Sequence, residues 1–212
     1  TQQITDLCGD TGSDALCIHL NPAMEIVQPG GDRDFRGGLE TLARLVKELP
    51  IPVVAKETGC GLSRQVARLI YDCGVRHLDV SGAGGTSWVA VEAHRATDEV
   101  ARHIAEELWD WGIPTGASVL QCGGFGFQIV ATGGMRTGTD VARAVALGAT
   151  AGGLAAPVLK AYRAGGIDGA RSFLRRVIQT VRAIMLLTGS PNLAELRRAP
   201  KHLGPDLARW QP

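Results

Sequence analysis

The chain has 212 residues, of which 45% are hydrophobic and 20% charged, and its formal net charge is +1. This composition is typical of a globular protein of one domain or slightly more, and it lacks both the basic clusters that bind nucleic acid and the apolar run of ~20 residues that crosses a bilayer. The five cysteines show no C-x-x-C spacing and the first residues do not resemble a signal segment, so we expect reduced thiols in a cytoplasmic protein.

The first part of the chain alternates short apolar runs with amphipathic segments. Residues 15–20 predict a strand that ends in a polar loop. Residues 34–49 predict a helix with Asp34 as its N-cap, because leucines recur there every three or four positions. Residues 52–56 predict the next strand, and residues 63–73 predict a helix that Ser63 caps.

The alternation continues in the second part after a looser middle. Residues 77–81 predict a third strand, followed by a glycine-rich loop, a helix at residues 97–111 and a helix start at Pro114. The remaining predicted elements are a strand at residues 128–132, a helix at 139–147, a strand at 149–154, a helix at 168–188 and a helix start at Ser190-Pro191, with Pro in the first position.

Strands that alternate with helices predict an α/β fold, either an open doubly wound sheet or a (β/α)8 barrel. The predicted strands end in polar or small residues, namely His19, Lys56, Ser81, Thr132 and Ala155. A barrel builds its site from the carboxyl ends of all its strands, whereas an open sheet uses one switch point, so the pattern favours the barrel. Because a barrel has eight strands, we expect residues 1–212 to form a single partial barrel domain, with three N-terminal βα units outside this chain.

The most specific motif is the pair Gly133-Gly134, which joins a predicted strand to a predicted helix. Bare backbone N–H groups at a helix N-terminus form an anion site, and the loops after the last two strands of a barrel commonly hold phosphate. Ala155 and Ala156 follow the next strand. We therefore expect a phosphate site here; the alternative is that the glycines only make a tight turn.

A second glycine-rich loop, residues 81–88, follows the third predicted strand. Its glycines would let the backbone approach a flat or anionic ligand, although the loop matches neither the G-x-G-x-x-G nor the P-loop spacing. The alternative is a flexible connection. Lys56 ends an otherwise apolar strand, where a lysine reaches either solvent or an anion, and beside a phosphate site we expect the anion.

His19 and Asn21 are two positions apart and therefore share one face of the first predicted strand. Glu25 follows in what we predict to be a polar loop. One carboxylate beside a diphosphate is the usual way to hold Mg²⁺, which keeps most of its waters. The alternative for Glu25 is a solvated loop charge.

Several motifs follow one another over nearly the whole chain. They are His19-Leu20-Asn21-Pro22 with Glu25, Gly31-Asp32-Arg33-Asp34-Phe35, Lys56-Glu57, Gly61-Leu62-Ser63-Arg64, residues 79–88, residues 111–115, Thr132-Gly133-Gly134-Met135-Arg136-Thr137-Gly138 and Ala155-Ala156-Pro157. In this combination the chain resembles the type 2 isopentenyl-diphosphate isomerases, which are FMN-dependent (β/α)8-barrel enzymes. Other flavin barrels share the glycine pair but not the rest.

The resemblance implies a cofactor, a metal and a reaction. FMN would be contacted by Lys56, Ser81 and Thr86, and its phosphate by Gly133, Gly134, Arg136, Ala155 and Ala156. His19 and Asn21 would face the substrate, and Glu25 would hold the Mg²⁺ that bridges to the substrate diphosphate. The reaction implied is the conversion of isopentenyl diphosphate to dimethylallyl diphosphate, with FMN reduced by NADPH, in a homo-oligomer.

Met24 departs from the family pattern, which has Gln immediately before the metal-binding Glu. The resemblance implies that this Gln relays protons or positions substrate, whereas Met offers no hydrogen-bond donor. Two alternatives therefore stay open. One is a related FMN-dependent oxidoreductase such as a 2-hydroxy-acid oxidase, although no His-Gly-Gly-Arg-like motif follows the third predicted strand; the other is a flavin-binding homologue without activity.

Overall fold

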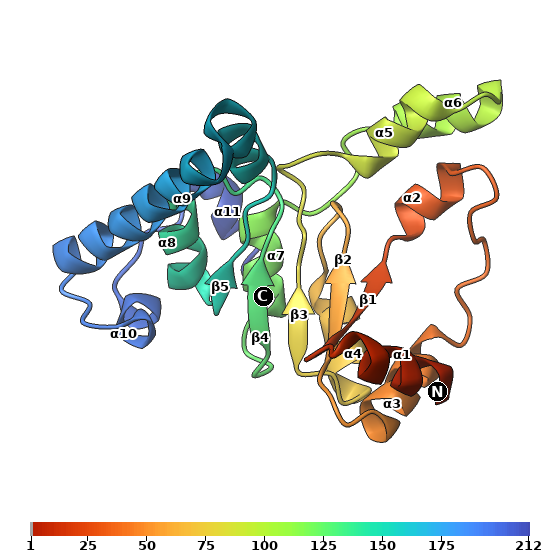
Figure 1. Cartoon of the computed structure of the whole chain (residues 1–212), viewed down its shortest axis with the longest axis horizontal. Helices are drawn as coiled ribbons and strands as arrows, with labels where there is room; N and C mark the ends of the chain where they lie inside the picture. The colour runs from red at the N-terminus through yellow and green to blue at the C-terminus, as the bar shows by residue number, and fades with distance from the viewer. Residues whose placement is uncertain (1) are drawn as a thin grey trace.

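The computed structural model describes residues 2–212 and contains a five-stranded sheet (Figure 1). The strands are β1 (Leu16–Leu20), β2 (Val53–Glu57), β3 (His77–Asp79), β4 (Gln128–Ala131) and β5 (Ala151–Gly152). Every neighbouring pair is parallel, and the order across the sheet is the order along the chain. A doubly wound sheet reverses its strand order at a switch point, so the unbroken order is that of a segment of a (β/α)8 barrel.

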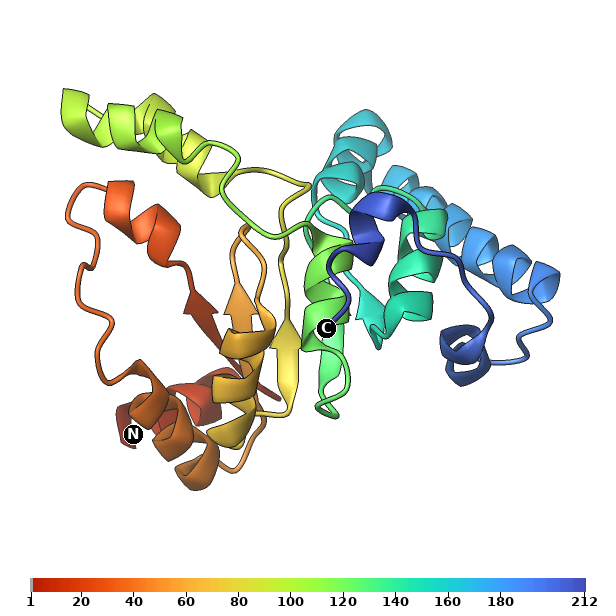
Figure 2. The ribbon, with the colours of Figure 1, turned by 180° about the vertical axis from the view of Figure 1, so that it is seen from behind.

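Helices connect and flank the strands (Figures 1 and 2). Those before β4 are α1 (Gln2–Thr11), α2 (Pro22–Val27), α3 (Gly38–Glu48), α4 (Arg64–Asp72), α5 (Trp88–Arg95), α6 (Glu99–Glu107) and α7 (Thr115–Cys122). Those after β4 are α8 (Gly138–Leu147), α9 (Ala156–Leu187), α10 (Leu193–Arg198) and α11 (Pro205–Ala208). Within residues 2–212, none of these helices combines the length and apolarity needed to cross a membrane.

The two faces of the sheet differ in chemistry because side chains alternate along each strand. One face carries Ala55, Leu78 and Ile129, which are buried in the main core against side chains of α3, α4, α7 and α8. The other face carries Lys56 and Asp79, which are only partly buried. The alternation thus places Lys56 and Asp79 together on the face opposite the main core.

The predicted strands are confirmed, while β3 and β5 are shorter than predicted. Ser63 caps α4 by accepting from the Val66 N–H group, as predicted. The helix predicted from Asp34 instead begins at Gly38, after Gly37 in a left-handed conformation (φ 79°). Asp34 instead pairs with Arg36 in the segment that precedes the helix.

Several helices differ from the sequence prediction. The predicted polar loop that contains Glu25 is the helix α2, which starts at Pro22, and α5 occupies part of the segment predicted as a loop. The closing helix begins at Ala156 and is kinked at Gly165 and Gly166, so its first turns precede the predicted start. Asn192, and not the predicted Ser190-Pro191 pair, provides the start of α10, because its side chain accepts from the Glu195 N–H group.

Candidate functional site

The residues predicted to form the site lie at or just beyond the carboxyl ends of the strands. His19 on β1 pairs in register with Lys56 on β2, and Lys56 pairs with Asp79 on β3. Ser81 and Thr86 follow β3, the glycine pair follows β4, and Ala155 and Ala156 follow β5. In a parallel sheet these ends share one edge, so the fold gathers the predicted residues as expected.

A polar network connects the ends of β2, β3 and β4. The Lys56 ammonium lies 3.4 Å from Oδ2 of Asp79, and both side chains are mostly withdrawn from water, at 24% and 14% exposed. Oδ1 of Asp79 accepts from the Ser81 N–H group at 3.1 Å and from the Thr132 hydroxyl. The network fixes the positions of residues from three strands at one edge.

The loops after β3 and β4 contact each other through their backbones. A Cβ at Gly133 would collide with the carbonyl oxygen of Gly82, and one at Gly134 with that of Gly84. Arg136 spans both loops, because its guanidinium donates to the Gly134 and Gly84 carbonyl oxygens at 3.0 Å each. The glycine pair therefore has a structural role beyond a tight turn, since it permits this close approach.

Backbone donors remain available at this edge. Within residues 2–212, the N–H groups of Gly133 and Gly134 donate to no acceptor. The first turn of α9 also has free donors, because its N-cap residue, Ala155, has no side chain that could accept from them. At the N-terminus of α8 the capping box of Thr137 and Asp140 satisfies the N–H groups of these two residues. The glycine pair and the start of α9 therefore offer backbone donors to an anion.

Glu25 lies on α2 and is held by two contacts. Its Oε1 atom accepts from Nδ2 of Asn21 at 2.9 Å, and its Oε2 atom accepts from the Asp32 N–H group at 3.0 Å. A carboxylate can accept further bonds at both oxygens, so the side chain still has room for a cation. Residues 2–212 contain no group of three His, Cys, Asp or Glu side chains that could hold a metal, so a cation at Glu25 would have at most two such protein ligands.

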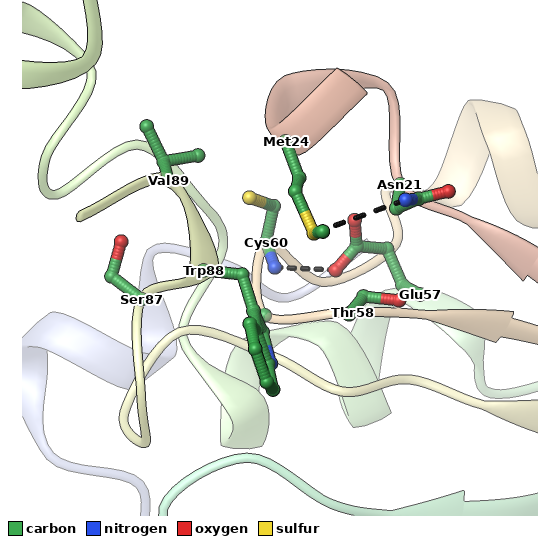
Figure 3. A pocket seen from close by; sticks show the side chains of 9 residues that line it. Asn21, Met24, Glu57, Thr58, Cys60, Ser87, Trp88 and Val89 are labelled. Atoms are coloured by element: carbon green, nitrogen blue, oxygen red, sulfur yellow. Dashed lines mark hydrogen bonds between the residues drawn. The ribbon is translucent and has the colours of Figure 1, made fainter. Parts of the chain in front are cut away.

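A small pocket lies between α2, the β2–α4 loop and the start of α5 (Figure 3). Asn21 and Met24 line it, and the two side chains approach within 4.0 Å at Nδ2 and Sδ. The Thr58 hydroxyl oxygen is buried, with no hydrogen-bond partner in the described part of the chain. The pocket thus places the Met24 thioether beside the Asn21 amide and the Glu57 carboxylate of β2.

The sequence prediction gave Glu57 no role, yet its carboxylate forms a wall of this pocket and is 5% exposed. Burial raises its pKa, although the N–H groups of Cys60 and Gly61 donate to its Oε2 atom and oppose the shift. Burial, together with the nearby Glu57 charge, raises the pKa of the Cys60 thiol to about 11. An acid that directly follows an apolar strand and precedes a Gly-x-Gly turn is the sequence signal that could have identified Glu57.

Comparison with known proteins identifies the family of this chain. Residues 30–203 match the family described as FMN-dependent dehydrogenase. The chain belongs to this family. A mandelate oxidase with an FMN adduct, which is 24% identical, superimposes with a TM-score of 0.63 over 95% of this chain and 59% of its own. At that identity the likeness concerns the fold, and it confirms the partial α/β barrel.

Curated relatives of this chain include isopentenyl-diphosphate delta-isomerases. The enzyme of Thermococcus kodakarensis is 47% identical over 189 residues, which is 89% of this chain and 50% of the relative. The enzyme of Stutzerimonas stutzeri is 47% identical over 188 residues, which is 88% of this chain and 54% of the relative. The resemblance to the type 2 isomerases is thereby confirmed. The chain spans about half the length of the curated relatives that it matches.

Proposed function

We propose that this protein is an FMN- and Mg²⁺-dependent isopentenyl-diphosphate isomerase, which forms dimethylallyl diphosphate. The observation that carries the proposal is the 47% identity to isopentenyl-diphosphate isomerases over 89% of the chain. His19 and Asn21 belong to β1 and the start of α2, and Glu25 lies on α2, beside the carboxyl end of β1. We also propose that NADPH reduces the flavin. We further propose that the protein forms a homo-oligomer, and the molar mass measured by light scattering after size-exclusion chromatography would test this.

The residues at the carboxyl edge fit FMN. The free N–H groups of Gly133 and Gly134 and the uncapped start of α9 at Ala155 and Ala156 would hold the phosphate. Arg136 uses two guanidinium nitrogens on loop carbonyls, which leaves further donors for the same anion. Lys56, Ser81 and Thr86 would contact the remainder of the cofactor.

Glu25 would hold Mg²⁺ beside the diphosphate of the substrate. The Asn21 amide and the Asp32 N–H group fix the direction of the carboxylate before the metal arrives. Mg²⁺ commonly binds proteins through one or two carboxylates and retains several waters, so a lone glutamate is compatible with this metal.

The isomerisation moves a double bond by adding a proton at one carbon and removing one from another. When bound, the reduced flavin supplies an acid–base group in a site of limited hydration. His19 and Asn21 would orient the substrate through hydrogen bonds. Met24 has no N–H or O–H group, so its thioether can neither donate a hydrogen bond nor supply a proton.

The decisive experiment is an anaerobic incubation of the protein with reduced FMN, Mg²⁺ and isopentenyl diphosphate, followed by detection of the allylic isomer. Its formation would support the proposal. Oxidation of a 2-hydroxy acid would instead indicate a related oxidoreductase, an alternative that Met24 leaves open. Flavin binding without either activity would indicate a non-catalytic homologue.

The role of Glu25 is tested by Glu25→Gln. Because the amide is a poor ligand for Mg²⁺ in place of the carboxylate, we expect Mg²⁺-dependent turnover to be lost while FMN still binds. Glu48→Gln, a change of an exposed glutamate at the end of α3, is the matched control and should leave turnover unchanged. Full Mg²⁺-dependent turnover by Glu25→Gln would refute this role.

A further inference from the structure

Asp79 is the residue on which the polar network at the carboxyl edge converges. Its carboxylate meets the Lys56 ammonium from β2, the Ser81 N–H group after its own strand β3, and the Thr132 hydroxyl after β4. The side chain is 14% exposed, so these contacts are sheltered from water. Three of the chain segments that would surround FMN are therefore tied to one carboxylate.

The contact with Ser81 stabilises an unusual backbone conformation. Ser81 has φ 32°, and within residues 2–212 it is the sole non-glycine residue with a positive φ. This region is sterically unfavourable for a residue with a Cβ and persists only when its surroundings enforce it. The hydrogen bond from the Ser81 N–H group to Asp79 is such a constraint, and the glycine-rich loop that reaches Thr86 starts from this turn.

The contact with Lys56 sets the direction of an otherwise flexible side chain. A lysine side chain has four rotatable bonds, and holding it in one direction costs conformational entropy. Besides Asp79, its ammonium donates to the Glu57 carbonyl oxygen at 2.9 Å. A charged partner in a partly dry site supports this direction more strongly than a neutral acceptor does.

We propose that Asp79 is a positioning residue for the flavin site, which orients Lys56 and holds the Ser81 turn and Thr132 in place without contacting the substrate. This inference rests on the proposed FMN site. Its two functions can be separated, because Oδ1 serves Ser81 and Thr132 while Oδ2 faces Lys56.

The substitution Asp79→Asn separates the orientation of Lys56 from the support of Ser81 and Thr132. The Asn carbonyl oxygen can still accept from Ser81 and Thr132, but an amide NH₂ group replaces the charged oxygen that faces Lys56. We expect the far-ultraviolet circular dichroism and the melting temperature to stay close to wild type. We expect FMN affinity, measured by quenching of flavin fluorescence, to fall about tenfold or more, which is the size of a charged hydrogen bond.

A double-mutant cycle shows whether the loss acts through Lys56. If Asp79 orients Lys56, then Asp79→Asn combined with Lys56→Met should bind FMN no more weakly than Lys56→Met alone. The two single variants should also change the absorption bands of bound FMN in the same way. Asp72→Asn is the matched control. It breaks an exposed ion pair with Arg68 and should change neither the FMN affinity nor the absorption bands of bound FMN.

Some outcomes would overturn the inference. Wild-type FMN affinity in Asp79→Asn, or additive losses in the double variant, would show that Asp79 does not act through Lys56. If Asp79→Asn does not fold, Thr132→Val tests the remaining arm, and wild-type FMN affinity in that variant would also contradict the proposal. Failure of the wild-type protein to bind FMN would overturn the proposed function itself.

Discussion

Glu57 shows how one buried side chain links stability to pH. Its carboxylate is buried at the end of β2, and burial raises its pKa above the ordinary value of 4.5. The folded protein therefore binds this proton more readily than the unfolded chain does. Its contribution to stability is complete at a pH below 4.5 and is lost as the pH rises through the higher pKa of the folded state.

We expect the free energy of unfolding of wild type to fall, relative to that of Glu57→Gln, between about pH 4 and about pH 7, by about 1.4 kcal/mol for each unit of pKa shift. The Gln variant lacks the titrating proton and serves as the reference. Urea unfolding at the two pH values measures the difference. A constant difference between the two proteins would contradict a raised pKa at Glu57.

Met24 lies in the pocket with Asn21, at the position where the family resemblance implies a Gln. If the protein is a weakened isomerase, Met24→Gln supplies an amide that can donate and accept hydrogen bonds and so position the substrate for proton transfer. We expect turnover of isopentenyl diphosphate to rise by about tenfold or more, which lies below the usual contribution of a positioned acid or base. Met24→Leu, which adds no polar group, should give no gain.

The result for Met24→Gln distinguishes two interpretations. A gain in isomerase turnover would support the proposed function with a suboptimal residue at position 24. An unchanged isomerase rate, or oxidation of a 2-hydroxy acid, would favour the related oxidoreductase.

The loops that follow β3 and β4 depend on each other, as their backbone contacts show. Gly134 has φ 79°, and a Cβ there would collide with the backbone of Gly84. Two separate features thus require glycine at this position, namely the backbone conformation and the contact. The loops after two different strands act as one structural element.

Gly134→Ala and Gly124→Ala separate these two requirements. Gly124 has a similar φ of 82°, but no atom lies within 4 Å of a Cβ at that position. Backbone strain should lower the free energy of unfolding of both variants by about 1 kcal/mol. Overpacking should lower that of Gly134→Ala by roughly 1–3 kcal/mol more. Chemical denaturation measures both, and equal losses would show that the contact between the loops is unimportant.

The outer strands of the sheet, β1 and β5, each pair on one side only within the described residues. In this arrangement FMN would connect the ends of β2 to β5, which are otherwise joined by the network at Asp79 and by the two glycine-rich loops. Ligand binding to the folded state alone stabilises it by mass action. The whole sheet should therefore gain stability from the cofactor.

We expect FMN at a concentration about 100 times its dissociation constant to add about 2.7 kcal/mol, and to raise the melting temperature by roughly 5–10 °C. Riboflavin at the same concentration should have a much smaller effect, because it lacks the phosphate for which the Gly133 and Gly134 N–H groups are free. Thermal melts followed by circular dichroism test this. Equal shifts with FMN and riboflavin would argue against the phosphate site.

Local sequence patterns were sufficient for much of the fold and for the prediction that the candidate residues lie at one edge of the sheet. The apolar runs that became the strands, the Ser63 cap and the glycine pair after β4 all depend on neighbouring residues, so the sequence predicts them. The ordered succession of polar residues after the strands also indicated the barrel arrangement. Parallel pairing then places these residues at one edge.

Other features depend on contacts between distant residues, which no local pattern contains. The sequence alone determined the α/β class, the strands and the candidate residues around the glycine pair. Only the tertiary structure decided that Glu57 is a buried pocket wall, that Asp79 connects three strands and that the glycines serve contact between two loops. The physical reason is that burial, pKa and the approach of backbones depend on segments up to 53 residues apart, as for Asp79 and Thr132.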